Sequence, residues 1–153
     1  MHWKDLKVWE KTHNLVLEVY RVTSGFPKEE LYALTNQLRR SSASVAANIV
    51  EGQSRNTTKE YLQFLYNSRG SLEEARYHLL LAKDLEYLAI DKYMHLENQY
   101  EEISKMLNSL ISRIKGLTDK GLGKEGLGKE GLGKEGLRST GLEVQRVEGV
   151  KSV

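Results

Sequence analysis

Apolar residues recur at three- and four-residue steps along most of the first 115 positions, the spacing of one face of an α-helix. In residues 31–52 this series is Leu31, Leu34, Leu38, Val45 and Ile49. Residues 41–47 of the same stretch are all serine or alanine except for one valine. Small side chains let neighbouring helices approach closely, so we predict that this stretch is the central helix of a bundle.

Three further segments share the helical rhythm, and cap signals suggest their limits. We predict a first helix from an N-cap at Asp5 to about Thr23, and the second from residue 28, after the break at Pro27, to a left-handed cap at Gly52. A third begins at Thr57 or Thr58 and ends within 84–87. A fourth runs from an N-cap at Asp91 to 115–116.

Short connections between the four predicted helices favour antiparallel neighbours. The predicted fold is therefore all-α, an antiparallel up-down-up-down four-helix bundle over residues 3–116. Gly70 lies in the middle of the third helix, where glycine costs about 1 kcal/mol relative to alanine. We expect it to face the small residues of the second helix, because a close approach there would offset that cost.

The first helix carries two apolar stripes rather than one. One stripe consists of Leu6, Trp9, His13, Val16 and Tyr20. The other, beside it, consists of Val8, Leu15, Val19 and Val22. Either the helix is sandwiched in the core, or the second stripe is an interface with another subunit; both alternatives stay open.

The sequence changes character at Leu117. Gly-Leu-Gly-Lys-Glu occurs at 121–125 and recurs at 126–130 and 131–135. This period matches neither a helix nor a strand, and its glycine content is too high for a packed core. We expect residues 117–153 to be a disordered, glycine-rich tail.

Composition narrows the setting and the chemistry. The 153 residues include no cysteine, which excludes disulfides and thiol catalysis, and the net charge is only +2. The N-terminus is charged throughout, unlike a signal peptide, and no apolar window approaches the roughly 18 residues of a membrane span. We therefore expect a cytoplasmic protein.

No arrangement of residues indicates an active site. His2, His13, His78 and His95 are scattered, and no two of them lie four residues apart as the ligands of a helical zinc site do. Gly52 and Gly70 are isolated, so the predicted bundle also lacks a phosphate-binding glycine loop. We therefore expect no enzyme activity, no metal and no cofactor.

Basic residues of the second and third helices and their connection are the best functional candidates, since they could neutralise phosphates. The candidates are Arg39, Arg40, Arg55, Lys59, Arg69 and Arg76. Alternatively, they pair with nearby acids, which are Glu51, Glu60, Glu73 and Glu74.

Several motifs occur in the order and spacing of a known family. They are Asp5-Leu6-Lys7-Val8-Trp9, Phe26-Pro27-x-x-Glu30-x-Tyr32, Leu34-Thr35-x-Gln37-Leu38-Arg39-Arg40, Ala47-Asn48-Ile49-x-Glu51-Gly52-x-x-Arg55, Phe64-Leu65 and Gly70-Ser71-Leu72-x-Glu74. Over about residues 3–115 the chain resembles the bacterial 23S ribosomal RNA intervening-sequence proteins. Ala33 departs from the pattern, which often has glycine there.

This resemblance implies a four-helix bundle that assembles into a homopentameric ring and is associated with insertions in ribosomal RNA genes. It also implies a relation in fold to accessory proteins of diversity-generating retroelements, which bind nucleic acid and a reverse transcriptase. It supplies no catalytic residues. We expect a ribosome-associated, non-enzymatic oligomeric module that binds RNA or a ribonucleoprotein partner. The alternative is a protein-interaction scaffold with no nucleic-acid role.

Overall fold

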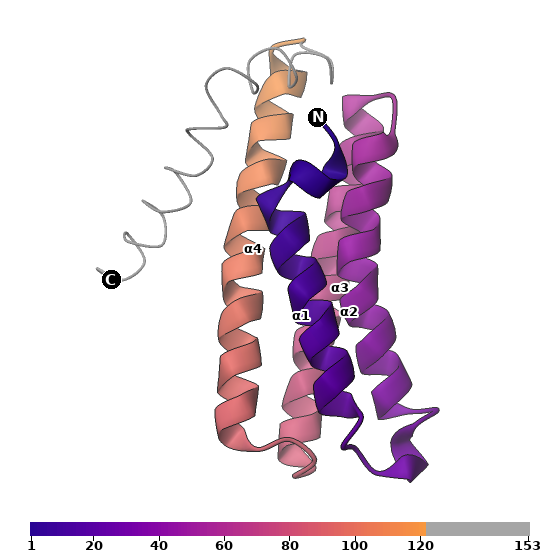
Figure 1. Ribbon diagram of the computed structural model, residues 1–153. Helices are drawn as coiled ribbons and strands as arrows, with labels where there is room; N and C mark the ends of the chain where they lie inside the picture. The colour runs from indigo at the N-terminus through magenta and orange to yellow at the C-terminus, as the bar shows by residue number, and fades with distance from the viewer. Residues whose placement is uncertain (122–153) are drawn as a thin grey trace, which may run out of the picture.

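The computed structural model describes residues 1–121, which form a bundle of four antiparallel helices (Figure 1). The helices are α1 (Lys7–Thr23), α2 (Leu34–Ser54), α3 (Thr58–Asp84) and α4 (Ile90–Asp119). Short 3₁₀ turns over Trp3–Asp5 and Lys28–Glu30 precede α1 and α2. The all-α, up-down-up-down architecture predicted from the helical rhythm is confirmed.

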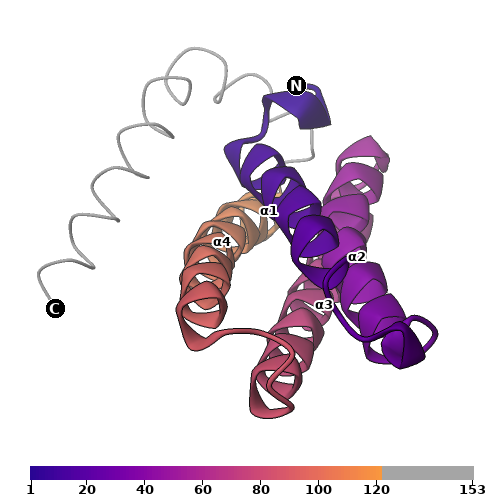
Figure 2. The ribbon, with the colours of Figure 1, turned by 60° about the horizontal axis from the view of Figure 1, so that its bottom comes forward.

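The core is built from one apolar stripe of each helix. In α3 and α4 the residues at alternating four- and three-residue steps are the ones that lose all solvent contact, such as Leu65 and Leu72 in α3 and Leu96 and Ile103 in α4. Each such side chain stabilises the fold by about 1.5–3 kcal/mol relative to an exposed one. Figure 2 shows the packing order: α1 lies against α2 and α4, and α3 lies between α2 and α4 on the far side.

Small residues form the seam between α2 and α3. The hydroxyl of Ser68 donates a 2.7 Å hydrogen bond to the carbonyl oxygen of Val45, and the hydroxyls of Ser44 and Ser71 lie 2.9 Å apart. These contacts require the two backbones to be close. The expectation that the serine- and alanine-rich part of α2 packs closely against α3 is therefore confirmed.

The glycine that this close approach requires is Gly52, not Gly70. A Cβ atom on Gly52 would lie 2.9 Å from Cβ of Phe64 and 3.0 Å from Cδ1 of Tyr61. A Cβ atom on Gly70 would meet nothing within 4 Å, so the expected contact of Gly70 with α2 is wrong. The expected left-handed cap at Gly52 is also wrong, because Gly52 is helical and α2 continues to Ser54.

Two helix starts differ from the cap predictions. The N-cap of α1 is Leu6, while the carboxylate of Asp5 accepts a hydrogen bond from the backbone N–H of His2 within the preceding turn. Likewise, α4 is capped at Ala89, and Asp91 lies in its first turn. Apolar residues occupy both cap positions, which side-chain chemistry alone does not predict.

The second helix begins six residues later than expected, at Leu34. Residues 28–30 form a separate turn, and Ala33 has non-helical torsions (φ −121°, ψ −107°). The carboxylate of Glu30 accepts a hydrogen bond from the backbone N–H of Leu34, satisfying one of the free donors at the start of α2. By contrast, the N-cap of α3 is Thr57, one of the two residues predicted for it, and its hydroxyl accepts a hydrogen bond from the backbone N–H of Glu60.

The end of α4 lies beyond the expected domain boundary. The helix continues through residues 117–119, which were expected to belong to the disordered tail. The remaining tail, residues 122–153, lies outside the described part of the chain. Of the four helices in residues 1–121, none combines the length and hydropathy of a membrane-crossing helix.

Candidate nucleic-acid interface

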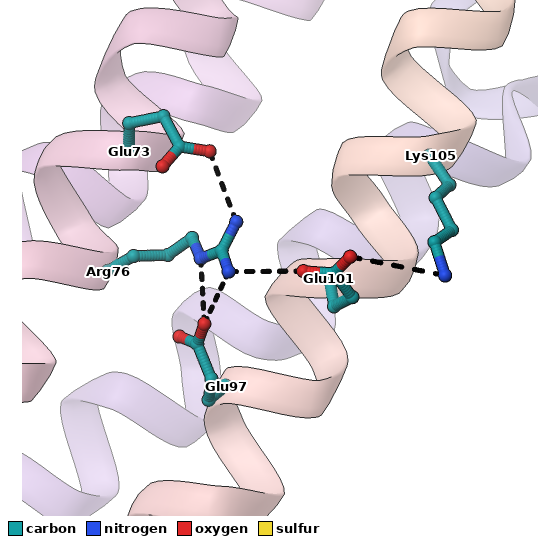
Figure 3. Close-up of polar contacts among 5 residues, drawn as sticks. All are labelled: Glu73, Arg76, Glu97, Glu101 and Lys105. Atoms are coloured by element: carbon teal, nitrogen blue, oxygen red, sulfur yellow. Dashed lines mark hydrogen bonds and ion pairs between the residues drawn. The ribbon is translucent and has the colours of Figure 1, made fainter.

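The six basic candidates do not form a single patch. One of them, Arg76, contacts three acidic side chains (Figure 3). Its guanidinium donates to carboxylate oxygens of Glu73 at 3.1 Å, Glu97 at 2.9 Å and Glu101 at 3.1 Å. The hydrogen bond to Glu97 raises the pKa of the Arg76 guanidinium above its ordinary value. Arg76 therefore fastens α3 to α4, and its charge is compensated.

Arg39 and Arg69 also bridge helices, but through neutral partners. Nε of Arg39 donates a 2.8 Å hydrogen bond to the Thr23 hydroxyl, and its guanidinium lies 4.8 Å from the ring centre of Tyr20. Nη1 of Arg69 donates a 3.2 Å hydrogen bond to the side-chain oxygen of Asn108 on α4. Both side chains therefore serve the packing of the bundle.

Arg40, Arg55 and Lys59 are exposed. Arg40 lies on the outer side of α2. Arg55 and Lys59 flank the connection from α2 to α3, and the guanidinium of Arg55 lies over the ring of Phe64, 4.5 Å from its centre. Arg55 and Lys59 are thus the two candidates that the structure brings to one end of the bundle.

Other basic residues gather at the same end, which also holds the chain start and the end of α4 (Figure 1). The side chain of Gln53 donates a hydrogen bond to the carbonyl oxygen of Met1, which fixes the N-terminal segment beside the end of α2. We call residues 1–7, 51–60 and 113–121 together the basic end. Its basic residues are Lys4, Lys7, Arg55, Lys59, Arg113, Lys115 and Lys120, and its acidic residues are Asp5, Glu51, Glu60 and Asp119.

The opposite end has a different charge balance. Residues 20–33 and 83–93 hold four basic side chains, Arg21, Lys28, Lys83 and Lys92, and five acidic ones, Glu29, Glu30, Asp84, Glu86 and Asp91. The bundle is therefore electrostatically polar along its axis. Sequence reasoning missed this feature because three separate chain segments contribute to the basic end.

The predicted oligomer interface is mostly inside the bundle. Val8, Leu15 and Val19 are buried within the single chain, and Val22 is half-buried against the core. The second stripe of α1 is therefore sandwiched in the core, and its assignment to a subunit contact is wrong. The outer side of α1 instead exposes part of the first stripe, including His13 and Tyr20.

The histidines remain apart from one another in the fold. Nε2 of His95 lies 3.0 Å from a carboxylate oxygen of Glu18, which joins α4 to α1, and His78 lies 3.5 Å from Glu74 on its own helix. In residues 1–121 there is no group of three or more histidine, aspartate or glutamate side chains placed to hold a metal ion.

Comparisons with known proteins identify a structure similar to this bundle and the family to which the chain belongs. A solved structure of unknown function, from the S23 ribosomal protein family of Bacteroides thetaiotaomicron, matches with a TM-score of 0.65 and 24% identity, covering 69% of this chain and 95% of that one. No curated protein matches this chain. The family model described as 23S rRNA-intervening sequence protein matches residues 4–109. The chain belongs to the 23S rRNA-intervening sequence protein family.

Proposed function

We propose that this protein is a non-enzymatic, oligomeric module that binds RNA through its basic end. The observation that carries the proposal is the charge balance of that end, where seven basic side chains stand against four acidic ones. An excess of cations at one end suits the phosphate backbone, which is bound largely independently of sequence. The name of the family, 23S rRNA-intervening sequence protein, agrees with an RNA partner.

Oligomerisation strengthens such a surface, because each copy adds its own basic end. Exposed apolar side chains suggest where copies meet. Leu17 and Tyr20 lie on the outer side of α1, and Ile90 and Met94 lie at the start of α4, with 56–68% of each α4 side chain exposed. We propose that the first region contacts the second on a neighbouring copy, a head-to-tail contact that closes into a ring of five, as the family resemblance implies.

The test of RNA binding is a salt series on the purified protein, with a fluorescein-labelled single-stranded RNA read by anisotropy. Each phosphate contact to a single strand contributes about 0.7 to the slope of log affinity against log salt. The double variant Arg55→Ala/Lys59→Ala should therefore lower the slope by about 1.4. The matched control Arg21→Ala/Lys92→Ala removes two exposed cations from the opposite end and should leave the slope unchanged.

Absence of binding at low salt would reject the RNA role and favour the protein-interaction scaffold. Equal effects of the two double variants would reject the basic end as the site.

The assembly is tested separately by multi-angle light scattering. Leu17→Glu or Met94→Glu should shift the wild-type oligomer towards a monomer, because each places a charge in the proposed contact. A monomeric wild-type protein would refute the ring.

A further inference from the structure

Four aromatic rings form a continuous ladder at the start of the chain. The ring centres of His2 and Trp3 lie 4.9 Å apart, and Trp3 meets Trp9 edge-on at 4.6 Å. Trp9 and His13, one turn apart on α1, lie parallel within 10°, with their centres 5.2 Å apart. The ladder therefore joins the N-terminal 3₁₀ turn to the first two turns of α1.

The two ends of this ladder are open to solvent. Trp9 packs partly against the core and Trp3 is half-buried, so the two indoles hold the N-terminal turn in place. The terminal rings, His2 and His13, are exposed. Since the parallel stack ends at His13, the outer face of that imidazole is where a further flat ring would extend it.

Cations accompany the ladder. Nζ of Lys4 lies 5.3 Å from the ring centre of Trp3, and Lys7 is exposed at the start of α1. Both lysines belong to the basic end. Proteins bind single-stranded nucleic acid with aromatic rings that stack on the bases and cations that contact the phosphates. This stacking requires unpaired bases, because the faces of paired bases are covered by their neighbours in a duplex.

We propose that the ladder of His2, Trp3, Trp9 and His13 is a stacking platform for unpaired bases of single-stranded RNA. This rests on the proposed RNA binding and adds the form of RNA that is recognised. A base stacks on the outer face of His13, while Lys4 and Lys7, which both precede His13 at the N-terminal end of the ladder, meet phosphates farther along the strand. Affinity at this platform depends on unpaired bases rather than on a particular sequence.

The chain carries its own reporter for this site. Trp3 and Trp9 are the only tryptophans in the sequence, and both lie in the ladder. We would titrate the full-length protein with an oligouridylate of about ten nucleotides, within the usual site size of stacking proteins. Tryptophan emission and the anisotropy of a labelled oligouridylate would be followed in parallel. Saturable quenching with the same midpoint as the anisotropy is expected, and an RNA duplex of equal length should quench far less.

Substitution of His13 tests the platform without removing either reporter. His13→Ala should weaken oligouridylate binding by at least about 5-fold, the lower limit for losing one base stack. His13→Phe should restore binding, because it keeps a flat ring. Tyr32→Ala is the matched control: it removes a side chain that is 90% exposed at the opposite end of the bundle, and binding should not change. Circular dichroism checks that each variant is folded.

The outcomes separate the two proposals. RNA binding in anisotropy without tryptophan quenching, or with His13→Ala as tight as wild type, would overturn the platform and leave the basic end in place. Equal quenching by the duplex would overturn the recognition of unpaired bases. A change in tryptophan emission on raising protein concentration without RNA would assign the ladder to a contact between copies. No anisotropy change at low salt would reject the proposed function itself.

Discussion

Two glycine-to-alanine substitutions should affect stability in opposite directions. Gly52 and Gly70 both lie in helices of the same hairpin, and both substitutions add one methyl group. At Gly70 the methyl meets nothing within 4 Å. At Gly52 it would lie 2.9 Å from Cβ of Phe64 and 3.3 Å from the carbonyl oxygen of Tyr61, atoms that cannot rotate away.

The magnitudes follow from two terms. Alanine is favoured over glycine in a helix interior by up to about 1 kcal/mol, and Gly70→Ala should gain most of this. Gly52→Ala gains no more from propensity, because Gly52 lies near the end of α2, and it suffers overpacking of about 1–3 kcal/mol. The gain in helix propensity is common to both variants and largely cancels when their free energies of unfolding are compared. The two free energies should therefore differ by about 1–3 kcal/mol, the cost of overpacking at Gly52.

Urea unfolding followed by circular dichroism measures both free energies of unfolding, and equal m-values would confirm comparable unfolded states. Gly52→Asn separates close packing from a left-handed cap as the reason for glycine at this position. Asparagine tolerates the left-handed cap conformation, but it is larger than alanine. It should destabilise the protein more than Gly52→Ala does. A Gly52→Ala variant as stable as Gly70→Ala would show that α2 and α3 are not in this close contact.

Three further predictions concern stability. Arg76→Ala should lower the free energy of unfolding by about 1–3 kcal/mol, because the half-buried Glu97 loses its donor; Arg76→Lys should recover only part of this in urea titrations. Burial raises the pKa of the Tyr61 and Tyr100 phenols, so above about pH 10 they ionise in the unfolded chain before the folded one. Stability should therefore fall as pH rises, by up to about 1.4 kcal/mol per pH unit for each tyrosine, and a Tyr61→Phe/Tyr100→Phe variant should show a shallower fall in urea titrations at several pH values. Removal of residues 122–153 should leave the thermal midpoint unchanged in calorimetry, because the described core extends only from Leu6 to Ile114; a large drop would contradict this.

The sequence was sufficient for features that repeat or act locally. The heptad-like rhythm of α3 and α4 identified their buried faces, because helical spacing alone decides which residues share a side. The cap at Thr57 was predictable because the hydroxyl and the N–H that it binds lie three residues apart. The family motifs likewise lie along the chain and require no knowledge of packing.

Features that depend on how helices face each other were not predictable. Successive residues of an α-helix are rotated by about 100° around its axis, so Gly70 points roughly 100° away from Ser71. Ser71 therefore lies in the seam with α2, and Gly70 lies outside it. Glu97 and Glu101 engage Arg76 from another helix, and their pairing depends on the register of α3 against α4. The two apolar stripes of α1 could not be distinguished from the sequence. The orientation of α1 about its own axis in the bundle decides which stripe is buried.

The modest anchorage of α1 has a consequence for the order in which the protein opens. Of the five residues that α1 buries, two are threonines, Thr12 and Thr23, whose hydroxyls bond to carbonyl oxygens of the same helix. Longer α3 buries nine residues and is joined to α2 by the serine seam. Amide hydrogens of α1 should therefore exchange with solvent through a local opening that leaves the hairpin of α2 and α3 intact. A ligand held at the start of α1 would slow that exchange, because the local opening would have to release it.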